Sequence, residues 1–431
     1  MRVAVVGGGW AGMAAAVAAA QAGHDVTVFE AARTLGGRAR GVTVTLPDGH
    51  DVRLDNGQHI LIGAYTDSLR LMWTVGIDPA AALLRLPLAL TFPGGAGLAL
   101  PDWPAPWDAV AGILRARGWT WRDKLALLRT ATAWQLHGFT CAPDATVADL
   151  CVPLPRRLQD EFIEPLCVSA LNTPASAASG TVFLRVLKDA MFGLRGGSNL
   201  LLPRVDLGAL FPEAAADWLA RQGHGVQVGQ RVQTLRCTAT DAAAPGWQVN
   251  DNRFERVILA TAAPDAVKLA IDASADAPEA TARRLQAWAT DAGALRHEAI
   301  TTVYALADAG LPQPMLALRP DAHHPAQFVF DRGQLGGPAG LLAFVISAST
   351  GERDTLQAAV TAQALTQLQR VVQPIQTITE KRATFACTPG LRRPGPEPAP
   401  GLLAAGDYID GPYPATLEGA VRSGWAAGTR G

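Results

Sequence analysis

The sequence lacks the features that mark several protein classes. Its five cysteines are odd in number and form no C-x-x-C pair, which is typical of a chain in a reducing compartment with buried thiols. The net charge is −1 and there is no long basic run, so we expect no nucleic-acid partner. Neither a metal-ligand spacing such as H-E-x-x-H nor a G-x-S-x-G elbow occurs. We therefore expect no metal site and no serine hydrolase.

Long hydrophobic runs are also missing. Residues 10–22 are apolar but too short, and too interrupted by glycine, to span a bilayer. A first strand is expected from residue 2, which leaves no room for a signal peptide, and we expect a cytoplasmic protein. A chain of 431 residues that is 49% hydrophobic and 17% charged can bury a sizeable core, and we expect two intertwined domains.

The beginning of the chain carries a dinucleotide motif. An apolar predicted strand runs into Gly7-x-Gly9-x-x-Gly12. Gly7 permits the tight turn, Gly9 lets the backbone approach a pyrophosphate, and Gly12 allows close helix packing, while the helix N-terminus offers free N–H groups. Glu30 follows a second predicted strand at 25–29, where its carboxylate can accept the hydroxyls of a ribose. Together these features predict a dinucleotide site.

Two further segments favour FAD over NAD. Gly36-Gly37-Arg38 follows Glu30 closely, and Gly406-Asp407 ends an apolar predicted strand near the other end of the chain. A carboxylate there can accept a hydrogen bond from a ribityl hydroxyl, which NAD lacks. A helix expected over 416–427 would point its N-terminus at the flavin ring and stabilise the reduced anionic flavin.

These motifs also carry a resemblance to a known superfamily. Together with Arg195-Gly196-Gly197, they resemble the flavin-containing amine oxidase and phytoene desaturase superfamily. Within it, residues 54–65 and 164–173 resemble the hydroxysqualene dehydroxylases, the squalene-associated FAD-dependent desaturases of bacterial hopanoid pathways. The resemblance spans nearly the whole chain. It implies an α/β fold, in which a Rossmann-like FAD-binding domain carries an inserted α+β substrate-binding domain.

The motifs and the resemblance together assign the cofactor site and the domain limits. The expected cofactor-binding residues are Gly7, Gly9, Trp10, Ala11, Gly12, Glu30, Gly36, Gly37, Arg38, Val232, Gly406, Asp407, Ala415, Thr416 and Leu417. The expected FAD-binding domain is discontinuous and comprises residues 1–65, 195–263 and 380–431. Residues 66–194 and 264–379 would form the substrate-binding domain, with the flavin ring and the substrate pocket at the junction.

For hydroxysqualene reduction, which the resemblance implies, the allylic hydroxyl must leave as water and the carbon must accept hydride from reduced flavin. The squalene formed would serve squalene and hopanoid biosynthesis. A proton donor is needed, and the first candidate is His59 beside the flavin, oriented by Asp55. Further candidates are Glu164, Cys167 and Tyr413, although each of the five residues also has a purely structural explanation.

Other functions remain open at this stage. A carotenoid or phytoene-type desaturase would run hydride transfer in the opposite direction, and an amine oxidase would need an aromatic cage and usually a lysine, whereas this chain has only four tyrosines. A prenyl-lipid-binding escort protein would bind lipid without redox chemistry. No second G-x-G-x-x-G occurs, so the electron donor is either NAD(P)H bound transiently or a separate reductase.

The first inserted segment mixes tryptophans with cations. These residues are Trp103, Trp107, Trp119, Trp121 and Trp134, with Arg115, Arg117, Arg122, Lys124 and Arg129. Indole rings and cationic side chains suit a membrane–water interface, but a hydrophobic core with solvated arginines explains the pattern equally well. The polyprenoid substrate that the resemblance implies favours a peripheral contact with the inner face of the cytoplasmic membrane.

Overall fold

A parallel five-stranded sheet holds the two ends of the chain together. The computed structural model describes residues 1–238 and 246–430. In spatial order the strands are β10 (Gly225–Val228), β2 (Asp25–Glu30), β1 (Arg2–Val6), β14 (Arg256–Leu259) and β20 (Leu402–Ala404). The central strands are almost entirely buried, as expected of a parallel sheet covered on both faces. The predicted Rossmann-like sheet is confirmed.

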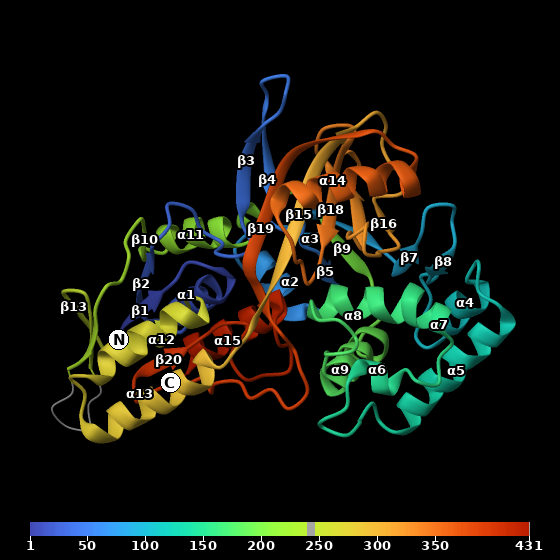
Figure 1. Cartoon of the computed structure of the whole chain (residues 1–431). Helices are drawn as coiled ribbons and strands as arrows, with labels where there is room; N and C mark the ends of the chain where they lie inside the picture. Colours follow the sequence, from blue (N-terminus) through green and yellow to red (C-terminus); the bar gives the residue numbers. More distant parts are fainter. Residues whose placement is uncertain (239–245, 431) are drawn as a thin grey trace.

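The first and last helices pack against each other on this sheet. Helix α1 (Trp10–Gln21) is rich in alanine, and Gly424 and Gly428 of α15 (Leu417–Thr429) lie directly against its backbone. Both chain ends consequently lie in the same lobe of the molecule (Figure 1). This lobe also contains α10 (Leu207–Leu210), α11 (Pro212–Arg221), α12 (Ala263–Ser274), α13 (Glu279–Gly293) and the three-stranded sheet of β11 (Leu235–Cys237), β12 (Trp247–Val249) and β13 (Asn252–Phe254).

A second, antiparallel sheet stands beside the first. Its strands, in spatial order, are β16 (Met315–Ala317), β17 (Phe328–Asp331), β18 (Leu341–Ile346), β15 (His297–Ala307) and β19 (Val372–Phe385). Three helical segments lie near this sheet, namely η2 (Gly333–Leu335), α14 (Arg353–Gln363) and η3 (Ala364–Leu368). Two hairpins lie there as well, β3 (Gly41–Thr45) with β4 (Asp51–Asp55) and β7 (Ala89–Thr91) with β8 (Gly97–Ala99). A small sheet is formed by β5 (Leu61–Ile62), β9 (Leu200–Pro203) and β6 (Leu83–Leu86). Strand β19 runs through residues 379 and 380, where the sequence placed a domain limit.

Most of the remaining helices form a lobe on the right of Figure 1. They are α4 (Trp107–Arg115), α5 (Trp121–Leu136), α6 (Val147–Leu150), α7 (Arg156–Leu158), η1 (Gln159–Ile163), α8 (Glu164–Leu171) and α9 (Gly180–Phe192). Helices α2 (Thr66–Thr74) and α3 (Pro79–Ala82) lie nearer the centre, and α2 packs against α15. A capping box between Thr120 and Asp123 starts α5. Among the described residues, no helix has the length and apolar character needed to cross a bilayer.

Two local predictions differ from the structure. The sequence of residues 206–219 predicts one helix, but the structure divides it at Phe211, because Pro212 has no N–H to continue the hydrogen-bond ladder. The apolar pattern of residues 232–235 predicts a strand, but only Leu235 belongs to one. Both Gln233 and Thr234 donate their N–H groups to the side-chain oxygen of Asn250 instead of to a neighbouring strand.

Candidate active site

One cavity of about 730 Å³ lies at the carboxyl ends of the parallel strands. Its wall includes Gly7 and Gly9 after β1, Glu30 at the end of β2, and Asp407 after β20. Ligands bind at this edge in open α/β sheets. All the predicted cofactor-binding residues line the cavity except Gly12, which packs against the carbonyl oxygen of Gly7.

The adenosine end of the expected site is held by main-chain contacts. Glu30 accepts hydrogen bonds from the N–H of Gly8 at 2.6 Å and of Ala32 at 2.7 Å, which fixes its carboxylate beside the glycine turn. A Cβ atom on Gly12 would lie 1.9 Å from the carbonyl oxygen of Gly7. Only glycine therefore lets α1 start this close to the turn, and the N-terminus of α1 can face an anion.

At the expected ribityl end of the site, an ion pair joins distant parts of the chain. Arg38 pairs with the buried carboxylate of Asp407, and its other nitrogen donates to the carbonyl oxygen of Ala383 at 2.9 Å. Ala383 lies where the register of β19 shifts against β15, and this irregularity frees its carbonyl. The segments around residues 38, 383 and 407 thus meet on one wall of the cavity.

The turn after β4 holds His59 beside this wall. Both carboxylate oxygens of Asp55 lie close to His59 Nδ1, at 2.9 and 3.1 Å, and Asp55 also accepts the backbone N–H of His59. Asn56 accepts the N–H of Arg40 and donates to the carbonyl oxygen of Arg38, both at 3.0 Å. The turn is therefore fastened to the segment that carries Arg38, and His59 itself lines the cavity.

The charges around His59 favour its protonated form. Burial lowers the pKa of the imidazole, but Asp55 outweighs this effect and raises the net pKa above its ordinary value. Glu380 also raises this pKa, while Arg38 lowers it. Glu380 lines the same cavity from β19, opposite Ile300, and sequence reasoning missed it. Glu380 begins a run of three charged residues, Glu-Lys-Arg, and such a run in a sequence usually indicates a solvent-exposed surface.

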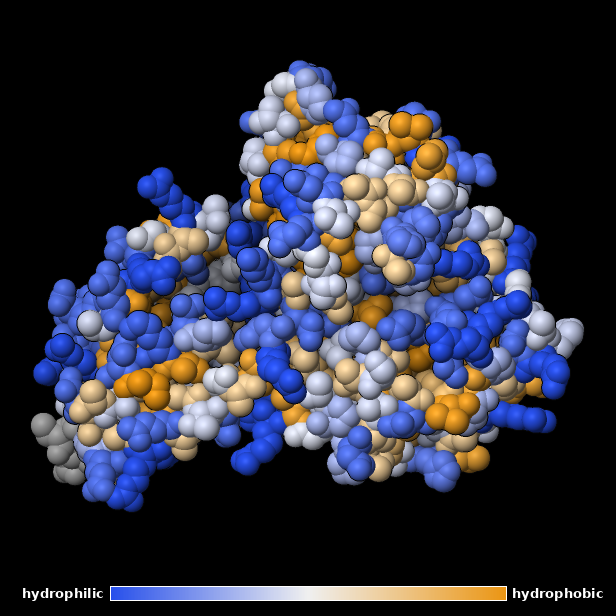
Figure 2. All heavy atoms as spheres, viewed as in Figure 1, coloured by the Kyte–Doolittle hydropathy of each residue, from blue (hydrophilic) through white to orange (hydrophobic). Residues whose placement is uncertain are grey.

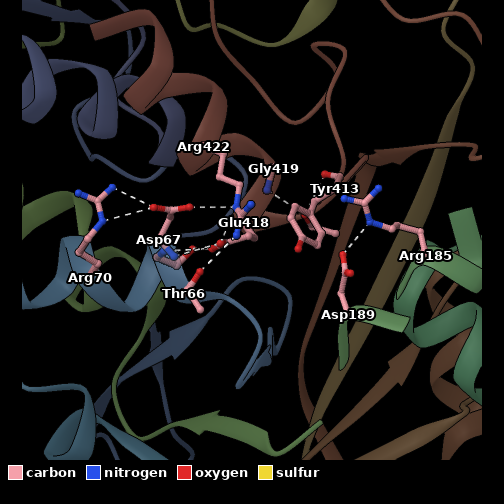
Figure 3. Close-up of polar contacts among 11 residues, drawn as sticks. Thr66, Asp67, Arg70, Arg185, Asp189, Tyr413, Glu418, Gly419 and Arg422 are labelled. Carbon is pink, nitrogen blue, oxygen red and sulfur yellow. Dashed lines mark hydrogen bonds and ion pairs between the residues drawn. The ribbon is translucent and has the colours of Figure 1, made fainter. Parts of the chain in front are cut away.

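The three further catalytic candidates are not among the residues of the cavity wall. Glu164 accepts the N–H of Ala175 at 3.1 Å, and burial raises its pKa. Cys167 is buried, and desolvation raises the pKa of its thiol, which disfavours a reactive thiolate. The ring of Tyr413 lies 4.5 Å from the Arg422 guanidinium (Figure 3). Each of the three has a structural contact of its own.

A buried carboxylate joins the start of α15 to the start of α2. Glu418 is fully buried and accepts hydrogen bonds from the N–H of Asp67 and of Ser68, both at 3.0 Å, and from the Ser68 hydroxyl at 2.7 Å. Arg422 donates to the same carboxylate at 2.8 Å, one helical turn along α15 (Figure 3). This contact fixes the helix terminus at Thr416 and Leu417, which line the cavity.

The cavity wall fits a flavin nucleotide. Trp10 and Tyr408 line it, and each carries a buried polar atom, the indole Nε1 and the phenol oxygen, that no described residue hydrogen-bonds. Buried polar atoms normally have a hydrogen-bond partner, so we expect a bound ligand to hydrogen-bond these two atoms. Within residues 1–238 and 246–430, no three His, Cys, Asp or Glu side chains come together as a metal site.

Comparison with known proteins decides the family. The model of the family described as "Flavin containing amine oxidoreductase" matches residues 10–430. The chain belongs to this family. It is an FAD-dependent oxidoreductase, and the expected cofactor and fold class are confirmed.

The similarity to individual proteins extends over nearly the whole chain. The chain is 28% identical to a hydroxysqualene dehydroxylase of Rhodopseudomonas palustris, with 97% of this chain and 96% of the relative covered. It is 26% identical to that of Zymomonas mobilis, with 98% and 97% covered. Cyclohexylamine oxidase from Brevibacterium oxydans has the same fold, with a TM-score of 0.67, a sequence identity of 16%, and 99% of this chain and 97% of that chain covered.

Proposed function

We propose that this flavoenzyme reduces hydroxysqualene to squalene by removing the allylic hydroxyl as water. The observation that supports this most directly is the His59–Asp55 pair, which presents a readily protonated imidazole to the flavin cavity. The full-length similarity to hydroxysqualene dehydroxylases supports the same substrate. A desaturase would instead need a group that accepts a proton.

Bound reduced FAD supplies hydride in this reaction. His59 Nδ1 faces Asp55, so Nε2 is the ring atom that can donate a proton to the hydroxyl. The carbon–oxygen bond breaks and water leaves, and the allylic cation would be neutralised by the hydride that bound reduced FAD supplies. One proton and one hydride are consumed for each water and squalene formed, and His59 regains its proton from solvent. Asp55 stabilises the imidazolium until the transfer.

Single-turnover reoxidation tests this proposal. Photoreduced enzyme is incubated anaerobically with hydroxysqualene, phytoene or squalene, and the flavin absorbance and lipid products are followed. We expect reoxidation with hydroxysqualene alone, yielding squalene, because only this lipid has an allylic hydroxyl to lose. The enzyme would instead be a desaturase if hydroxysqualene did not reoxidise the reduced flavin and phytoene bleached the oxidised flavin.

We also propose that the outer surface of α4 and α5 contacts the membrane. Trp107, Trp121 and Leu136 are 65%, 67% and 82% exposed. The carboxylates of Asp108 and Asp123 on these helices are buried, so the exposed charges beside the indoles are largely cationic. Figure 2 shows hydrophobic and hydrophilic residues interspersed over this lobe. Such a surface matches an anionic lipid interface.

Vesicle sedimentation tests the membrane surface. We expect wild-type protein to sediment with vesicles of phosphatidylglycerol and phosphatidylcholine, and the double variant Trp107→Ser, Trp121→Ser to bind about tenfold more weakly, because two interfacial indoles are lost. Trp73→Ser is the matched control, since Trp73 is 61% exposed on α2. Wild-type protein that stays in the supernatant, or an equal loss in the control, would contradict this role.

A further inference from the structure

Arg332 is a buried cation without an acidic partner. Arg332 is the residue that follows β17, and it is 4% exposed. Among the described residues, no carboxylate oxygen lies within 4.0 Å of its side-chain nitrogens. One guanidinium nitrogen lies 3.2 Å from the carbonyl oxygen of Pro203 and 3.5 Å from the side-chain oxygen of Gln58, while Nε has no partner. Burying an unpaired charge is costly, so an arginine retained here requires an explanation.

The contact of Arg332 with Gln58 falls on the turn that carries His59. Gln58 is buried and has φ of +48°, in the left-handed region that side chains other than glycine rarely adopt. Three residues before Gln58, the carbonyl oxygen of Asp55 accepts a hydrogen bond from the fully buried hydroxyl of Tyr304. Two buried side chains of the antiparallel sheet region therefore contact this turn, Tyr304 at its backbone and Arg332 at the Gln58 side chain.

The orientation of the His59 ring depends on that backbone. A Cβ atom on Gly57 would lie 2.6 Å from His59 Cε1, so the ring rests directly against the main chain at residue 57. A rotation of the backbone at residues 57 and 58 would move the ring away from Asp55. The distance between the His59 ring and Asp55 therefore depends on the backbone conformation of Gln58.

We propose that Arg332 is a positioning residue that holds the turn at residues 55–59 through Gln58 and thereby keeps His59 against Asp55. Its effect on turnover rests on the proposed function, whereas its effect on the His59 ring does not. The charged groups that face His59 are Asp55 on β4, Glu380 on β19 and Arg38 after β2. Loosening the turn weakens mainly the contact with Asp55, so the His59 pKa should fall toward its ordinary value.

The experiment titrates the His59 imidazole by NMR in FAD-loaded, oxidised enzyme with labelled histidine. A His59→Gln variant assigns the signal. In Arg332→Met and Gln58→Leu we expect the pKa to fall by about half a unit or more, and reoxidation by hydroxysqualene to slow by about tenfold, because the proton donor is misplaced. Gln58→Glu keeps an acceptor for Arg332 and should hold the pKa at or above the wild-type value.

Arg370→Met is the matched control. Arg370 Nε is also buried and makes no hydrogen bond to a described residue, although Asp308 lies 3.9 Å from it, and Arg370 contacts the carbonyl oxygen of Gly310 rather than the 55–59 turn. An unchanged His59 pKa in Gln58→Leu, or an equal fall in Arg370→Met, would overturn the positioning role even if Arg332→Met fails to fold. A fall in pKa without any change in the reaction rate would retain the positioning role and reject His59 as the proton donor, whereas wild-type enzyme that hydroxysqualene does not reoxidise would reject the proposed function.

Discussion

Replacing His59 with glutamine is expected to leave FAD bound but to slow reoxidation of the reduced enzyme by hydroxysqualene by about 10²–10⁴-fold, the usual contribution of a positioned acid. Glutamine retains much of the size of the ring but cannot supply a proton. Stopped-flow absorbance of the flavin measures the rate, and the spectrum of the purified variant reports cofactor content. Unchanged reoxidation in His59→Gln would remove this residue from the chemistry.

The pH dependence gives a second readout of the same prediction. Asp55 raises the His59 pKa above 6.5, so the protonated donor is present below the raised pKa and is lost as pH rises through it. The reoxidation rate should therefore fall on the alkaline side, with an apparent pKa above 6.5. Asp55→Asn removes the stabilising carboxylate and should move this fall to lower pH. A profile with the same alkaline fall in Asp55→Asn would contradict the assignment.

Replacing Glu418 with alanine is expected to destabilise the protein by about 3–5 kcal/mol. The change leaves the buried N–H of Ser68, the adjacent N–H of Asp67 and the Arg422 guanidinium without their shared acceptor (Figure 3). Urea unfolding of the FAD-loaded protein, followed by tryptophan fluorescence, measures the loss. FAD affinity should fall as well, because Glu418 fixes the start of the helix that lines the cavity.

An exposed carboxylate provides the control for this measurement. Glu279 pairs with Arg283 within α13, and both side chains are largely solvent-exposed. Glu279→Ala should change the free energy of unfolding by about 0.5 kcal/mol or less, since exposed pairs along a helix contribute little. A similarly small loss in Glu418→Ala would show that the α2–α15 contact is not a source of stability.

The sequence predicted the parts of the site that depend on local signals. The glycine turn, Glu30 and Gly406-Asp407 are each recognisable because a strand end, a turn and a helix start follow one another within a few residues. The same locality explains the correct expectation of the parallel sheet. Asp55 and His59 were also close enough in sequence to be considered together.

Residues whose roles depend on distant pairing were missed. Glu380 reaches the cavity from β19, where it pairs with Ile300 of β15 across 80 positions of the chain, and Arg332 meets Gln58 across 274 positions. Glu418 meets Ser68 across 350 positions. None of these three side chains belongs to a sequence motif, because the partner of each is determined by how whole sheets and helices pack.

The pairing of α1 with α15 has a consequence for biosynthesis. The glycine turn is synthesised long before Asp407 and α15. The face of α1 that packs on α15 therefore stays uncovered in the nascent chain until α15 has been synthesised, and FAD can contact both halves of its site only after that point.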